Sequence, residues 1–433
     1  MSEPYKSIES VRKFYFLEYF LVLLKSIEKY HDREKVFNQF KNLKQQYGLG
    51  ESKYKKLSVD SEILTKVQLD RYRYTFKQVI DESKEYKLIK ELKSGRLSFD
   101  EDGFKLLDIY KNEGIIHFNR FLFRKMEQMY SAFNYFINLL YTANKSNPGL
   151  LVFPIYSPRQ LGFEKQEVKT TQNIVTYSKE LVQRLVKDIH EYLGIKKKLS
   201  TENEILLKRL YDSGILLQKA DNKFDPNKYN VITKRIRDFW MNYFLREIYG
   251  YKYSMASFDI WAYRGKQIGL NYVTEFYPSF NGRIIYPTAI ITDSARSKDF
   301  IEVFKYTDGK KLYVHEPKIN NEKNQEKFID NLVKAYFDLR KFSKSYFINL
   351  MALKELVCYS MKIPNYLFDD FLGTVYKLHL SKNLRIKISL EVDKLPTETQ
   401  AMYLKQEPVL IDGKFRNIIA IDVTKGEKKW INY

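Results

Sequence analysis

Apolar residues recur every three or four positions along much of the first half of the chain, a spacing that predicts amphipathic helices. The stretches with this pattern are residues 5–47, 75–92, 116–143, 171–194 and 200–216. In the first of them, the apolar face consists of Leu17, Phe20, Leu21, Leu24 and Ile27. A run at residues 150–156 predicts a short buried strand, which Pro154 restricts to a sheet edge or a bulge because proline lacks a backbone donor.

The segment around residue 95 predicts a helix, a tight reversal and a second helix. The inward-facing side chains of the first helix, residues 75–92, are Phe76, Val79, Ile80 and Tyr86. The chain reverses at Ser94-Gly95, where glycine adopts a positive φ without steric cost. Ser98 and Glu101 match a capping box, in which each side chain satisfies a backbone donor at the start of the next helix. The residues that this next helix is expected to bury are Phe104, Leu107 and Tyr110 or Ile109.

A helix, a short basic hairpin and a capped helix in this order resemble the end of a winged-helix DNA-binding domain, in which a recognition helix precedes a two-stranded wing. The resemblance covers residues 50–110. It implies that Lys93 and Arg96 lie at the wing tip and face phosphates. The cations that it places on or before the preceding helix are Arg71, Arg73, Lys77 and Lys84. The alternative is a helical domain with a tight turn whose lysines are simply solvated.

A similar unit is expected at residues 200–251. Its second part interleaves cations with aromatic residues, a composition that suits phosphate contact combined with stacking. The cations are Lys234, Arg235 and Arg237. We interpret the neighbouring Phe239 and Trp240 as core residues and the arginines as phosphate contacts.

The pattern changes after residue 252. Three turn signals predict antiparallel hairpins: Asn281-Gly282, Asp308-Gly309 and Asp412-Gly413. Strict alternation over residues 385–393 predicts a half-buried strand, with Ile386, Ile388, Leu390 and Val392 on one face. Helices are expected at residues 325–341, 345–361 and 366–379.

Together these patterns predict an α+β protein with a mostly helical N-terminal half and a mixed α/β C-terminal domain. The expected division is a winged-helix-like domain at 1–115, a helical connecting domain at 116–199, a second winged-helix-like unit at 200–251 and the mixed domain at 252–433.

The net charge of the chain indicates what kind of molecule it binds. The 433 residues include 74 Lys and Arg against 53 Asp and Glu, which gives a formal net charge of +21. A field of this sign attracts polyanions, and nucleic acid is the usual one. The competing explanation for the many lysines is a bias in amino-acid composition. AT-rich genomes impose such a bias, and the chain is also rich in Tyr, Phe, Asn and Ile, which the same bias favours.

Other features narrow the class of protein. Cys358 is the only cysteine, so disulfides and thiolate metal sites within one chain are excluded. The most apolar segment, residues 14–24, contains Glu18 and is shorter than the roughly 20 residues that a bilayer span needs. No secretory signal is recognised. We therefore expect a cytoplasmic protein without a membrane partner.

Motifs for nucleotide hydrolysis, dinucleotide binding, serine hydrolysis and helical zinc sites do not occur, and the five histidines are scattered. One constellation, Glu316-x-Lys318 with Asp299 or Asp308 upstream, resembles the restriction-endonuclease-like family. The resemblance implies that the carboxylates hold Mg²⁺ while the lysine assists the attacking water. Pro317 departs from the family's core strand. A weaker set is Asp412, Asp422 and Lys425.

The sequence thus predicts a nucleic-acid-binding protein, with duplex DNA contacted mainly through its backbone, that needs no cofactor. In general character the chain is similar to non-ATPase accessory subunits of restriction and antiviral defence complexes. Two alternatives stay open. One is a Mg²⁺-dependent nuclease that uses Asp299, Glu316 and Lys318, and the other is a protein-interaction scaffold that uses some of the 30 Phe and 35 Tyr residues.

Overall fold

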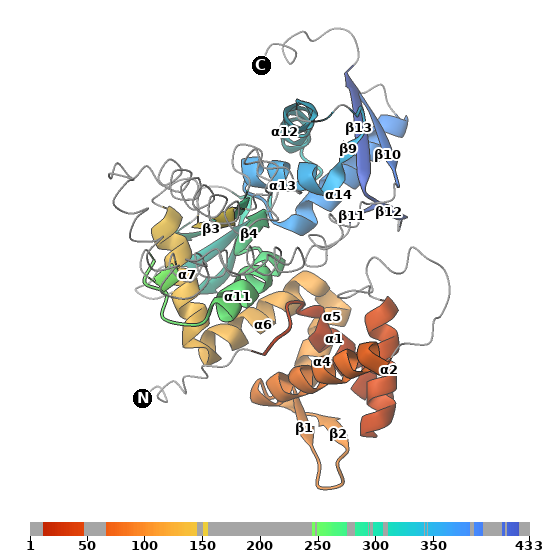
Figure 1. The fold of residues 1–433 in the computed structure, drawn as a ribbon, viewed down its shortest axis with the longest axis vertical. Helices are drawn as coiled ribbons and strands as arrows, with labels where there is room; N and C mark the ends of the chain where they lie inside the picture. Colours follow the sequence, from red (N-terminus) through yellow and green to blue (C-terminus); the bar gives the residue numbers. More distant parts are fainter. Residues whose placement is uncertain are drawn as a thin grey trace, which may run out of the picture. The chain divides into compact units, whose positions relative to one another are not determined.

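In the computed structural model the chain has a mixed α+β fold of helices and small antiparallel sheets, which confirms the predicted class (Figure 1). The residues that the structure describes are 12–46, 66–144, 150–154, 245–246, 249–274, 282–292, 294, 298–305, 311–341, 343, 345–381, 385–392, 409–411 and 414–423.

Two compact units divide the chain. The first comprises residues 1–136, 256–272 and 288–433, and the second comprises residues 137–255 and 273–287. The first unit therefore joins segments from both ends of the chain that the sequence assigned to separate domains. The predicted domain boundaries themselves stay a prediction.

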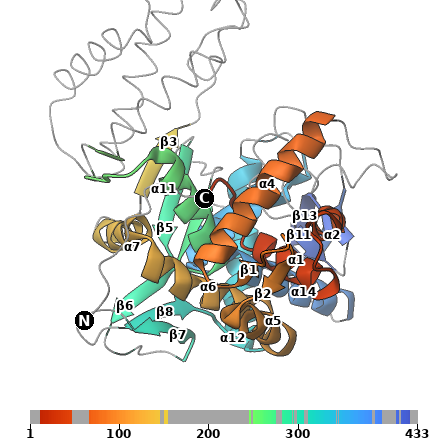
Figure 2. The same ribbon diagram turned by 90° about the horizontal axis from the view of Figure 1, so that it is seen from below.

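The N-terminal stretch forms two helices, α1 (Glu18–Lys29) and α2 (Arg33–Gln46), where one was predicted. The chain turns because Tyr30 is extended and Asp32 caps α2 by accepting a hydrogen bond from the Lys35 amide at 3.0 Å. The predicted apolar face of the first helix is fully buried. α1 packs against α2, α4 (Lys66–Glu85) and α5 (Glu101–Glu113), and Figure 2 shows α4 running beside it.

A hairpin of β1 (Ile89–Glu91) and β2 (Leu97–Phe99) joins α4 to α5, as the order of predicted elements requires. The predicted helix at 75–92 is nevertheless wrong beyond Glu85, because its last residues form β1. The predicted capping box is also wrong. Ser98 lies in β2, and Asp100 caps α5 through a 3.0 Å hydrogen bond from the Glu101 amide.

The burial expected on α5 is only partly correct. Leu107 is buried, but Phe104 is 62% exposed, because Gly103 and Leu106 occupy the inward positions instead.

The predicted helix at 116–143 is likewise divided, into α6 (Ile115–Met129) and α7 (Ser131–Asn144), which meet at the extended Tyr130. After them comes β3 (Leu150–Pro154), the end strand of the sheet β3-β5-β4. Its partner is β5 (Gly282–Pro287), with an irregular register between Leu151 and Phe153. The restriction imposed by Pro154 is confirmed by this edge position.

α11 (Met255–Gln267) is buried over most of its circumference, including the polar side chains Arg264, Lys266 and Gln267. It leads into β4 (Asn271–Thr274). A second sheet has the order β6-β8-β7, formed by β6 (Ala289–Thr292), β7 (Phe300–Lys305) and β8 (Lys311–His315).

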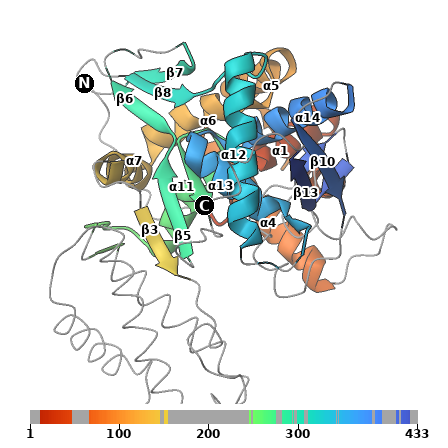
Figure 3. The same ribbon diagram turned by 90° about the horizontal axis from the view of Figure 1, so that it is seen from above.

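The C-terminal helices α12 (Glu322–Arg340), α13 (Leu350–Met361) and α14 (Asn365–Ser381) correspond to the three predicted helices and pack on one another (Figure 3). The helix predicted at 345–361 is wrong before Leu350, because Ile348 and Asn349 form a strand. A sheet of β10 (Ile386–Glu391), β13 (Ile418–Val423) and β9 (Ile348–Asn349) accompanies them. β10 alternates buried and exposed residues as predicted, although Val392 lies past its end and is exposed. Cys358 is fully buried within α13.

Two predicted hairpins are supported by strand pairing. β11 (Val409–Ile411) pairs with β12 (Lys414–Arg416), and the pair Ile411–Lys414 leaves only Asp412-Gly413 between the strands, as predicted. β7 pairs antiparallel with β8 on either side of Asp308-Gly309, but the last pair is Lys305–Lys311, so the connection is longer than the expected two residues. At Asn281-Gly282 a two-residue turn is wrong, because β4 ends at Thr274 and its neighbour β5 begins only at Gly282. The expectations for residues 171–194 and 200–216, and the second winged-helix-like unit with its cations, lie outside the described residues.

Candidate nucleic-acid interface

The hairpin between α4 and α5 is a regular two-stranded ladder with a tight tip. Ile89 pairs with Phe99 and Glu91 with Leu97. At the tip, the Gly95 amide donates to the Leu92 carbonyl at 2.8 Å, and Gly95 has a φ of 75° that favours glycine. Figure 1 shows the hairpin extending from the helices α1, α2, α4 and α5.

The base of the hairpin is fixed from two sides. On one side lies His31, in the turn between α1 and α2, whose carbonyl accepts from the Leu97 amide at 2.9 Å while its ring Nδ1 lies 3.2 Å from the Leu97 carbonyl. On the other side, α5 approaches the hairpin so closely that a Cβ on Gly103 would lie 2.0 Å from the Leu88 carbonyl oxygen. The tip is therefore held out by a rigid base.

Two carboxylates near the hairpin, Glu91 and Glu85, already have cationic partners. Glu91 accepts a hydrogen bond from Lys84 and another from Arg33 at 2.8 Å. The hydrogen bond from Lys84 is the main reason that the pKa of Glu91 lies below its ordinary value. Glu85 pairs in the same way with Arg12. These carboxylates do not neutralise the remaining cations of the hairpin.

Four such cations lie on the hairpin and on the turn before it: Lys87, Lys90, Lys93 and Arg96. All four are exposed. Within the described part of the chain, no carboxylate forms an ion pair with any of them. The hairpin consequently carries a concentrated positive charge into solvent.

The outer face of α4 adds further groups. Arg71 and Lys77 are exposed, and Tyr74, which lies between them on the helix, is 49% exposed. Arg73 differs, because it pairs with Glu34 at 3.1 Å and lies 4.8 Å from the centre of the Phe37 ring. It therefore joins α4 to α2.

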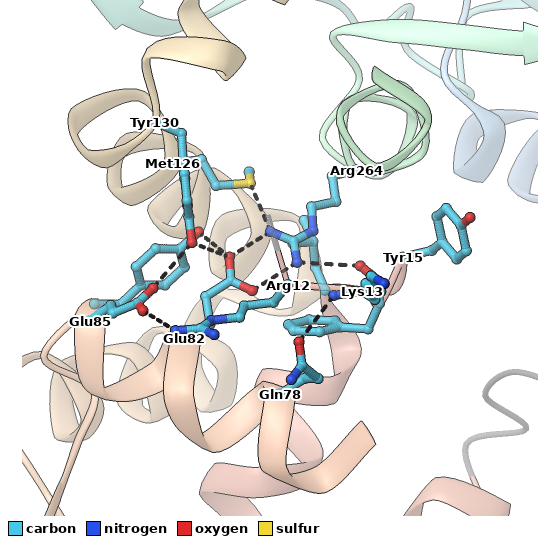
Figure 4. Close-up of polar contacts among 12 residues, drawn as sticks. Arg12, Lys13, Tyr15, Gln78, Glu82, Glu85, Met126, Tyr130 and Arg264 are labelled. Atoms are coloured by element: carbon cyan, nitrogen blue, oxygen red, sulfur yellow. Dashed lines mark hydrogen bonds and ion pairs between the residues drawn. The ribbon is translucent and has the colours of Figure 1, made fainter. Parts of the chain in front are cut away.

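A buried polar cluster anchors the inner face of α4 (Figure 4). Arg264 of α11 donates to both carboxylate oxygens of Glu82, at 2.7 Å and 2.9 Å, and both side chains are fully buried. The hydroxyls of Tyr86 and Tyr130 donate to Glu82 Oε1 at 2.8 Å and 3.1 Å. Arg264 also donates to the Phe14 carbonyl at 3.3 Å.

The electrostatics of this cluster follow from burial and pairing. Burial alone lowers the pKa of Arg264, but the Glu82 carboxylate outweighs it, so the pKa is raised and the guanidinium stays charged. Burial, together with the same carboxylate, raises the pKa of Tyr86 and of Tyr130. The cluster is an ion pair with neutral hydroxyl donors, and its role is to position α4.

The predicted interface residues thus have different placements. Lys93, Arg96, Arg71 and Lys77 are exposed on the hairpin and α4, whereas Lys84 and Arg73 are engaged in ion pairs. The predicted Lys234, Arg235 and Arg237 lie outside the described residues. Sequence reasoning missed Lys87 and Lys90, because it placed both in a continuous helix.

Comparison of the chain with models of protein families, with curated proteins and with solved structures finds no match in any of the three. Among the helices that the structure describes, none combines the length and the apolar character needed to cross a bilayer.

Of the residues of the nuclease alternative, Asp299 and Glu316 lie on neighbouring segments, but the Glu316 carboxylate is engaged by other groups. The Glu316 carboxylate accepts hydrogen bonds from Arg120 and from the Tyr366 hydroxyl, the latter at 2.7 Å. The Glu316 amide donates to the carbonyl of Asp299, and Lys318 is exposed. Among the described residues there is no group of three or more His, Cys, Asp or Glu side chains suited to a metal. Asp308, Asp412 and Lys425 fall outside these residues, and Asp422 is exposed on β13.

Proposed function

We propose that this protein binds nucleic acid, chiefly duplex DNA, through the β1–β2 hairpin and the outer face of α4. The observation that carries the proposal is the group of exposed, uncompensated cations on a hairpin whose base is fixed. Cations in such a position neutralise phosphates and release condensed counterions. Because phosphate contacts carry no sequence information, the binding is expected to show little base preference.

The order of elements supports this mode of binding. Along the chain, α1, the turn with His31, α2, α4 and the hairpin come in this order, and the His31 carbonyl accepts a hydrogen bond from β2. This order is similar to that of a winged-helix domain, in which a recognition helix precedes a two-stranded wing. In that arrangement the helix before the wing, here α4, enters a groove while the wing contacts the backbone.

The proposed cellular role rests only on the net charge of the chain and on its general likeness to accessory subunits of defence complexes. We propose that the protein acts in the cytoplasm, without hydrolysing ATP, as one subunit of a larger complex concerned with restriction or antiviral defence. The formal net charge of +21 supports a polyanionic partner. Co-purification with products of neighbouring genes tests the complex.

The test of DNA binding is a fluorescence-anisotropy titration of a labelled duplex over a series of salt concentrations. The affinity of the native chain should fall linearly in a log–log plot, by about a thousandfold between 50 and 200 mM salt for roughly six phosphate contacts. Lys93→Ala/Arg96→Ala should weaken binding and reduce the slope by about one unit per lost contact.

The matched control is Lys323→Ala/Lys334→Ala, which removes two exposed cations from α12 and leaves the hairpin intact. It removes the same formal charge, so a general charge effect would weaken both variants alike. Equal losses in the two variants, or no binding by the native chain at low salt, would refute the proposed interface.

A further inference from the structure

The tip of the β1–β2 hairpin carries one apolar side chain among its cations. Leu92, which directly follows β1, is 45% exposed. Lys90, Lys93 and Arg96 around it are exposed as well. A single exposed leucine is ordinary on a protein surface. This one, however, lies at the projecting end of a basic element whose base is fixed (Figure 1).

The register of the hairpin places Leu92 on the face that points away from the core. Side chains alternate between the two faces of a strand, and Ile89, Leu97 and Phe99 are buried on one of them. Lys90 therefore belongs to the other face, and Leu92 follows it by two residues. The outer face of the hairpin thus combines a cation with an apolar residue nearer the tip.

The backbone of Leu92 is fixed at two points. Its amide donates to the Arg96 carbonyl, and its carbonyl accepts from the Gly95 amide, each at 2.8 Å. These hydrogen bonds continue the ladder of β1 and β2 up to the turn. Because the tip is already ordered, little conformational entropy is lost when Leu92 is pressed against a partner.

We propose that Leu92 is an apolar wedge, which enters the minor groove of a bound duplex, partly unstacks one base step and bends the DNA. The inference rests on the hairpin interface proposed above. The minor groove is about 6 Å wide, which is too narrow for a two-stranded ribbon but admits a side chain at its tip. Apolar side chains inserted between base steps from this groove kink the duplex.

The cations beside Leu92 supply what a wedge needs. Unstacking a base step costs free energy, and the bend offsets this cost by bringing more phosphates within reach of the protein. Lys93 and Arg96 lie on either side of the turn, and Lys90 lies behind Leu92 on the same face. Leu92 therefore determines the bend, while the cations provide the affinity.

A wedge selects DNA by its deformability. Pyrimidine–purine steps such as TpA unstack more easily than stiff A-tracts. The protein should therefore prefer flexible steps without forming hydrogen bonds to base edges. Such a preference is compatible with the weak base readout that phosphate contacts give.

Fluorescence energy transfer between dyes at the two ends of a short duplex with one central TpA step measures the bend. The native chain at saturation should raise the transfer efficiency, because the two ends approach each other. Leu92→Ala should leave the bound duplex as straight as the free one, with a Kd changed by less than about tenfold, because the phosphate contacts stay. Leu92→Met keeps an apolar side chain of similar volume and should keep the bend.

A central mismatch gives a second readout, because a mismatched base is easier to unstack. The native chain should bind the mismatched duplex at least about fivefold more tightly than the matched one, whereas Leu92→Ala should bind both equally. The control is Leu380→Ala, which removes a 67% exposed leucine from α14. It should bend the duplex as the native chain does.

Three results would overturn the inference. They are a duplex that stays straight in the native complex, a duplex that Leu92→Ala bends as strongly as the native chain, and a loss of bending in Leu380→Ala equal to that in Leu92→Ala. With any of them, salt-dependent binding of the duplex still supports the hairpin interface. Absence of duplex binding at low salt would refute both proposals.

Discussion

The guanidinium of Arg264 donates hydrogen bonds to both carboxylate oxygens of Glu82, although the two residues are 182 positions apart in the sequence. The pair fixes α4 to α11 inside the first unit and is completed by the hydroxyls of Tyr86 and Tyr130. A buried ion pair is costly to break from one side, because the remaining charge then lacks a partner.

We therefore expect Arg264→Met to lower the free energy of unfolding by about 3–5 kcal/mol. The double variant Glu82→Gln/Arg264→Met should be clearly more stable than Arg264→Met, because no charge stays buried. Urea unfolding followed by circular dichroism measures both. A double variant as unstable as the single one would show that packing of the Arg264 side chain, and not its charge, determines stability.

Two glycines around the hairpin should respond differently to alanine. Gly95 has a positive φ and no atom within 4 Å of an added Cβ, so Gly95→Ala should cost only the conformational energy, about 1 kcal/mol. Gly103→Ala drives a Cβ into the Leu88 carbonyl and should cost about 2–3 kcal/mol. Equal losses in urea unfolding would argue against the close approach of α5 to the hairpin.

On α4, neighbouring cations should contribute unequally to duplex binding. Lys77→Ala should weaken binding and reduce the salt slope, because Lys77 is exposed on the outer face. Arg73→Ala should have a smaller effect on binding, since its guanidinium pairs with Glu34 and contacts Phe37. Anisotropy titrations of the two variants at several salt concentrations provide the comparison, and a larger loss for Arg73→Ala would contradict it.

His315 should make the stability depend on pH. Burial lowers its pKa below the ordinary value of 6.5, although its Nδ1 contacts the Lys362 carbonyl at 3.2 Å. As the pH falls below about 6.5, the unfolded chain takes up a proton on His315 before the folded chain does, so stability is lost in that window. His315→Asn keeps an N–H donor but does not titrate, and its thermal unfolding midpoint should fall less between pH 7 and pH 5. Identical decreases would exclude His315 as the source.

Much of the fold follows from local pattern. The buried faces of α1, α4 and α6 and the alternation of β10 are periodic in the sequence, and periodicity determines which side of an element is buried. Element ends were less predictable. Asp32 and Asp100 both cap helices, but Ser98 with Glu101 matched a capping motif that the backbone of β2 makes impossible.

The candidate interface was only partly predictable for a different reason. The exposed tip residues Lys93 and Arg96 follow from the turn at Gly95, whereas the engagement of Lys84 and Arg73 depends on carboxylates of other elements. The same holds for Glu316, whose partner Arg120 lies 196 residues away. Spacing along one chain does not encode such pairings.

Cys358 is the only thiol in the chain, and its burial raises its pKa to about 12. At neutral pH the native protein should therefore resist maleimide reagents. The thiolate is the reacting species, and at Cys358 very little thiolate forms and the sulfur atom is buried. A cysteine introduced at the exposed Ser94 would then be the one site open to attachment. A fluorophore placed there would stand at the end of the hairpin and respond directly to an approaching duplex, with no need to remove the native cysteine.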